Sequence, residues 1–96
     1  MNNKELYQQK VKAQLDEWKA EVDRLRAKAS GASADRQLKM NRQIEELEGQ
    51  IEDGRAKLAE LADTSEEAWE TIKDGFESAW DSLRSAFDDA VSKFRA

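Results

Sequence analysis

The chain has 96 residues, a net charge of −5 and 39% charged residues, and it contains no proline, cysteine or histidine. The lack of cysteine and histidine excludes disulfide bonds, thiol catalysis and the commonest metal ligands. The acidic balance argues against nucleic acid as a partner, because binding to phosphates needs a basic surface.

The first expected helix covers about residues 3–30. Its apolar residues recur at spacings of three and four, so they share one helix face: Tyr7, Val11, Leu15, Trp18, Val22, Leu25 and Ala29. Asn2 and Glu5 have the spacing of a capping box at its start. We expect Gly31 to end this helix in a left-handed conformation and Ser33 to cap the next one.

The second expected helix covers about residues 33–62 and carries a heptad pattern: Met40, Ile44, Leu47, Ile51, Gly54, Leu58 and Leu61. A glycine within a helix costs about 1 kcal/mol relative to alanine. Its place on the apolar seam suggests that Gly54 admits a bulky neighbour, and the pairing of an antiparallel hairpin points to Tyr7. Four pairs of opposite charges, four residues apart, are expected on exposed faces: Lys12–Asp16, Lys19–Asp23, Arg42–Glu46 and Asp53–Lys57.

The third expected helix covers about residues 65–95, with Thr64 and Glu67 as its capping box. Its sequence repeats every eleven residues, a period that keeps an apolar stripe on one side of a nearly straight helix. The stripe comprises Trp69, Ile72, Phe76, Trp80, Leu83, Phe87, Val91 and Phe94. Small residues border it and would let a neighbouring helix come close: Ala68, Gly75, Ala79, Ala86 and Ala90.

Two roles compete for this aromatic stripe. It can pack into the groove of the first two helices, or it can bind a lipid surface, an apolar client or another subunit. Residues 63–96 hold nine acidic and four basic residues, whereas helices that lie on membranes are usually rich in Lys and Arg. The charge therefore disfavours the lipid-surface role. The core role is favoured because apolar helical stripes usually pack in the core, and a hinge at residues 63–65 would connect the two states.

These patterns predict an all-α fold, an elongated antiparallel three-helix bundle. We expect a single helical domain over 1–96, in which 1–62 form a helical hairpin and 63–96 the amphipathic aromatic helix. No apolar run approaches the length of a membrane span, and the N-terminus lacks an apolar signal core. We therefore expect a cytoplasmic protein.

Short segments of all three helices resemble a family of small bacterial coiled-coil stress-response proteins. They are residues 13–18 (AQLDEW), 43–47 (QIEEL), 68–69 (AW) and 78–83 (SAWDSL). The resemblance implies a stress-associated, non-enzymatic protein with no established mechanism, and it supplies no catalytic residues.

The expected function is that of a structural or interaction protein that acts through its helix faces. We expect no enzymatic activity, cofactor or metal, because acidic runs such as 45–48 and 88–89 have the spacing of solvated helix faces. The expected partner is a protein, either a second copy in a homodimer or a client. The alternative is a peripheral lipid-surface protein that uses its C-terminal amphipathic helix.

Overall fold

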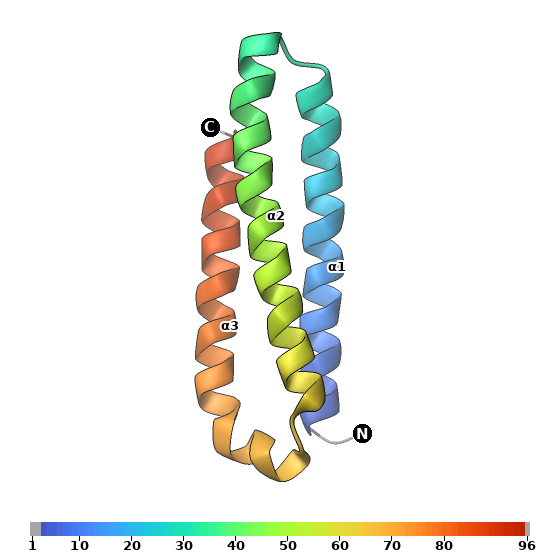
Figure 1. Cartoon of the computed structure of the whole chain (residues 1–96), viewed down its shortest axis with the longest axis vertical. Coiled ribbons are helices and arrows are strands. Elements are labelled where there is room, and N and C mark those ends of the chain that lie inside the picture. Colours follow the sequence, from blue (N-terminus) through green and yellow to red (C-terminus); the bar gives the residue numbers. More distant parts are fainter. Residues whose placement is uncertain (1–2, 96) are drawn as a thin grey trace.

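The computed structural model describes residues 3–95, which form three antiparallel helices. They are α1 (Asn3–Ser30), α2 (Ala34–Asp63) and α3 (Glu66–Arg95). The chain runs up, down and up again, and the molecule measures 53 × 20 × 17 Å (Figure 1). The predicted all-α elongated three-helix bundle is therefore confirmed.

The connection between α1 and α2 is made by turn hydrogen bonds. The Gly31 N–H donates to Lys28 O at 3.3 Å, and the Ala32 N–H donates to Ala29 O at 3.0 Å. No glycine within residues 3–95 has a positive φ, so the predicted left-handed Gly31 is wrong. Ser33 is the N-cap residue of α2, although its side chain makes no capping hydrogen bond. The predicted Asn2 cap lies outside the described residues.

The connection between α2 and α3 consists of Thr64 and Ser65. Thr64 closes α2, because its N–H donates to Leu61 O at 3.2 Å and its Oγ1 donates to Glu60 O at 2.8 Å. Ser65 caps α3, since its Oγ accepts a hydrogen bond from the Ala68 N–H at 3.1 Å. The predicted capping box from Thr64 is therefore wrong by one residue.

The three helix pairs of the core do not pack in the same way. Backbones approach closely between α1 and α2 and between α2 and α3, whereas aromatic rings fill the space between α1 and α3. Trp18 of α1 stacks on Trp80 and Phe87 of α3, with ring centroids at 5.1 and 4.5 Å. Nearer the N-terminus, Tyr7 contacts the rings of Trp69 and Phe76 at 5.2 and 5.8 Å. These rings hold α3 against the hairpin.

Gly54 is buried and makes room for three large side chains. A Cβ atom there would lie 2.5 Å from Leu15 Cδ2, 3.4 Å from Trp80 Cζ3 and 3.5 Å from Trp18 Cζ3. The predicted neighbour, Tyr7, is therefore wrong, because α1 and α2 pair in a register shifted along the axis from the one assumed. The prediction that Gly54 admits bulky side chains is confirmed.

The exposed faces carry short-range ion pairs. Lys12 and Asp16 form the predicted pair at 3.9 Å, but the other three predicted pairs do not form among residues 3–95. Most observed pairs instead span three residues, and one, between Arg26 and Glu48, joins α1 to α2. Such exposed pairs stabilise a fold only weakly.

Candidate interaction surfaces

The aromatic stripe of α3 lies mostly in the core. Its buried members are Trp69, Phe76, Trp80, Phe87 and Phe94. At about 100° per residue these five side chains fall within an arc of about 40° around the helix. Leu83 and Val91, on the two edges of that arc, are partly buried, and Ile72, further round, is 42% exposed. Among these eight stripe residues, burial thus follows the angular position around the helix.

The small residues beside the stripe are used only along the later part of α3. Ala90 is buried and Ala79 and Ala86 are half-buried, whereas Ala68 and Gly75 are exposed. Figure 1 shows why, because the first turns of α3 cross beneath the end of α2 before the helix runs alongside it. The predicted close approach is therefore confined to the last part of this edge.

A polar contact between α1 and α3 was not anticipated from the sequence pattern. The indole Nε1–H of Trp80 donates a hydrogen bond to Gln14 Oε1. Burying an indole without a partner would be costly, so Gln14 supplies the acceptor that allows Trp80 to lie in the core. The only available signal was that Gln14 neighbours the apolar stripe of its helix.

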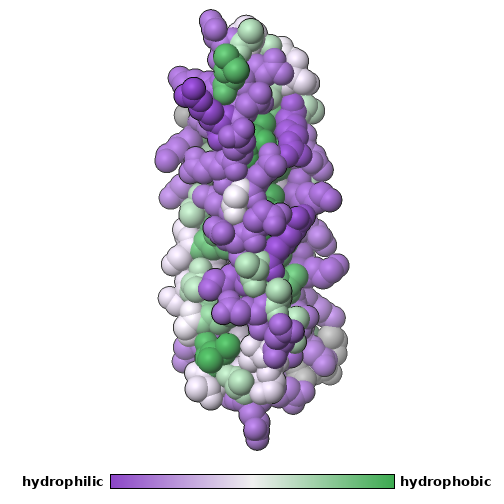
Figure 2. Space-filling model, in the orientation of Figure 1, coloured by the Kyte–Doolittle hydropathy of each residue, from purple (hydrophilic) through white to green (hydrophobic). Residues whose placement is uncertain are grey.

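Apolar side chains are scattered over the surface. The large exposed apolar residues of the described chain are Leu6, Leu38 and Ile72, one on each helix. On the face seen in Figure 2, the hydrophobic areas are small and separated by hydrophilic ones. Single exposed apolar residues are normal on soluble proteins and need no partner.

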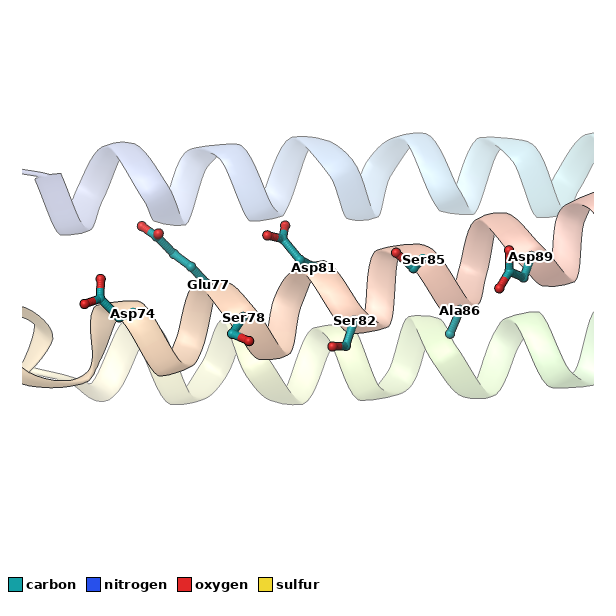
Figure 3. Close-up of a pocket in the computed structure, with 8 residues that line it drawn as sticks. All are labelled: Asp74, Glu77, Ser78, Asp81, Ser82, Ser85, Ala86 and Asp89. Carbon is teal, nitrogen blue, oxygen red and sulfur yellow. The ribbon is translucent and has the colours of Figure 1, made fainter.

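The outward side of α3 carries an acidic face. It lines a shallow groove and comprises Asp74, Glu77, Asp81 and Asp89, together with Ser78, Ser82, Ser85 and Ala86. In Figure 3, Glu77 and Asp81 point toward α1, whereas Ser82 and Ala86 point toward α2. Glu77 and Asp81 therefore lie on the side of α3 nearer α1, whereas Ser82 lies on the side nearer α2.

The field of this acidic face reaches α1. Burial and, to a lesser extent, the charges of Glu77 and Asp81 together raise the pKa of Tyr7 to about 12, while Arg84 acts in the opposite direction. Lys10 lies 5.3 Å from the centre of the Tyr7 ring. The phenol therefore stays neutral over the physiological range.

The described chain holds few features of a chemical site. Residues 3–95 contain no group of three His, Cys, Asp or Glu side chains that could hold a metal ion. Within the same residues no polar or charged residue is buried. No helix in the described part of the chain is long and apolar enough to span a membrane.

Comparisons with family models, curated proteins and solved structures find no match to this chain. The resemblance to coiled-coil stress-response proteins therefore stays a prediction.

Proposed function

We propose that this chain is a non-enzymatic interaction protein that binds basic segments of protein partners through the acidic face of α3. The observation that carries the proposal is the alignment of Asp74, Glu77, Asp81 and Asp89 along one exposed groove. Asp81 lies 3.6 Å from Arg84, and no ion pair within residues 3–95 engages the other three carboxylates. Their charge is therefore available to a partner.

The rigidity of the scaffold supports this proposal. The aromatic contacts with Trp18 and Tyr7 fix α3 on the hairpin, so the carboxylates keep a constant spacing. A fixed row of like charges attracts a basic segment over a distance and raises its association rate. The same charges repel anionic surfaces, which favours a protein partner over an anionic membrane.

The stress-associated part of the proposal rests on the resemblance of the sequence. Under it, the partner is a client protein whose basic segments are shielded during stress. The proposed absence of catalysis is supported by a composition without histidine or cysteine.

The test compares two variants that lose the same number of charges from different helices. The first removes the carboxylates of the acidic face: Asp74→Asn, Glu77→Gln, Asp81→Asn and Asp89→Asn. The matched control removes four exposed carboxylates of α2: Asp35→Asn, Glu45→Gln, Glu46→Gln and Asp53→Asn. Fluorescence anisotropy of a labelled peptide rich in Lys and Arg measures the dissociation constant at low ionic strength.

We expect the α3 variant to bind the peptide at least about tenfold more weakly than the native chain, because several exposed ion pairs are lost. The α2 control should retain most of the affinity, and added salt should weaken the native complex. Equal losses in both variants would mean that net charge alone attracts the peptide, and the proposed face would then be wrong.

A further inference from the structure

The apolar seam of α2 continues in phase into α3. From Leu61 the spacing of four reaches Ser65 and then Trp69, the first residue of the aromatic stripe. In one uninterrupted helix over 34–95, the seam of α2 and the whole stripe would fall within an arc of about 120°. The two-residue connection is therefore the only interruption of one continuous apolar side.

The interruption comprises only Thr64 and Ser65. Thr64 has φ −82° and ψ 135°, so its φ is already close to the helical value and a change of ψ toward about −42° would make it helical. The segment 62–68 contains no proline or glycine that would prevent a helix from passing through. The first connection differs, because it contains Gly31.

The apolar side is continuous in phase from α2 to α3, and only Thr64 and Ser65, which we call the hinge, interrupt it. From these two observations we propose that the chain forms a dimer by exchanging α3 with a second copy. In the dimer, residues 34–95 form one helix about 93 Å long. Each chain keeps its α1–α2 hairpin and lays α3 into the groove of the partner's hairpin.

The exchange preserves the contacts of the monomer. Trp80 and Phe87 stack on the partner's Trp18 instead of the chain's own Trp18, and Trp80 donates to the partner's Gln14. Because α3 packs antiparallel to α2 (Figure 1), the two long helices run antiparallel in the dimer, and the continuous seam lets them face each other along their whole length. The hinge gains helical backbone hydrogen bonds and loses the Ser65 side-chain cap, so exchange needs only a protein concentration high enough to compete with closure within one chain.

The test uses spin labels on the full chain, which has no native cysteine. Arg36 and Lys93 are exposed and line one groove where the end of α3 meets α2, and Arg36→Cys with Lys93→Cys carries the labels. The protein is unfolded in guanidinium, refolded at high concentration and separated by size. Doubly labelled chains are diluted into unlabelled ones before refolding, so pulsed EPR reports distances within one chain.

We expect a short distance in the monomer fraction and about 85 Å in the dimer fraction, since 57 residues of continuous helix then separate the labels. A dimer that retains the short distance within one chain would be a side-by-side dimer and would overturn the proposal. A chain that stays monomeric after this refolding, both in its native form and in the hinge variant below, would also overturn it.

Hinge variants test the mechanism separately. Thr64→Ala with Ser65→Ala favours a continuous helix and removes the cap of the closed form. Loss of the N-cap should shift the equilibrium of each chain from the closed to the extended form about fivefold. Because each dimer contains two such hinges, the association constant should rise about 25-fold. Glu66→Pro is tolerated at the first position of α3 but breaks a continuous helix, so it should abolish the dimer, while Glu66→Ala should not. An unchanged dimer in the Glu66→Pro variant would refute exchange through this hinge.

Discussion

A glycine-to-alanine pair in α2 tests the packing of the core. Gly54 and Gly49 lie in the same helix, but a Cβ at Gly54 would lie 2.5 Å from Leu15 Cδ2, while a Cβ at Gly49 would meet nothing within 4 Å. Carbon atoms pack best at about 3.5–4.0 Å, so the Leu15 methyl group must move by about 1 Å. Leu15 is only 6% exposed and the rings of Trp18 and Trp80 flank the glycine, so there is little space to receive it.

The two substitutions should differ in their effect on stability. Both gain about 1 kcal/mol of helix propensity, but overpacking at Gly54 costs about 1–3 kcal/mol. Gly49→Ala should therefore raise the free energy of unfolding by about 1 kcal/mol, which is about 4–8 °C in Tm for a domain of this size. Gly54→Ala should leave it unchanged or lower it by up to about 2 kcal/mol.

Urea and thermal unfolding followed by far-UV circular dichroism measure both variants. The difference between them isolates the steric contribution, because helix propensity is common to both. The double variant Gly54→Ala with Leu15→Ala should show a favourable coupling energy, because the added methyl group then fills part of the cavity. Equal stabilisation by Gly49→Ala and Gly54→Ala would refute the register of α1 against α2 described above.

Three further predictions concern the contacts of α1 with α3. Tyr7 is the single tyrosine, so tyrosinate absorbance should titrate near pH 12 in the folded protein. Its pKa in the folded protein lies above the unfolded value of about 10, so the free energy of unfolding should fall between about pH 10 and 12, and it should fall less in Tyr7→Phe. Urea unfolding measures this, and an equal dependence on pH in both proteins would contradict the prediction. Gln14→Leu should lower the free energy of unfolding by about 1–3 kcal/mol, because the Trp80 indole loses its acceptor, whereas Trp80→Phe combined with Gln14→Leu should remove that penalty in a double-mutant cycle. In Trp18→Phe, the remaining buried indoles, Trp69 and Trp80, should emit fluorescence in the blue. This emission should not change when anionic vesicles are added, because the exposed side of α3 is acidic. A red emission that shifts to the blue with vesicles would favour the lipid-surface alternative.

The sequence alone predicted the helices and their boundaries closely. Spacings of three and four select helix over strand, and without proline the breaks fall where apolar periodicity stops, so the expected 3–30, 33–62 and 65–95 match α1, α2 and α3 to within one residue at each end. The same periodicity identified the stripe of α3 and Gly54 as a position that needs space.

The tertiary structure decided how far each helix slides along its neighbour and how it is rotated. Periodicity determines the direction in which a side chain points around the axis of its helix. It contains no information on how far one helix is displaced along the axis of the next. Hence Gly54 meets Leu15, Trp18 and Trp80 rather than Tyr7, and Ile72, at the angular margin of a mostly buried stripe, stays exposed. The cap of α3 also differs from the prediction, because the Thr64 hydroxyl donates to Glu60 O at the end of α2 and Ser65 caps α3 instead. Local pattern determined the elements, and the packing of aromatic rings between α1 and α3 determined their arrangement.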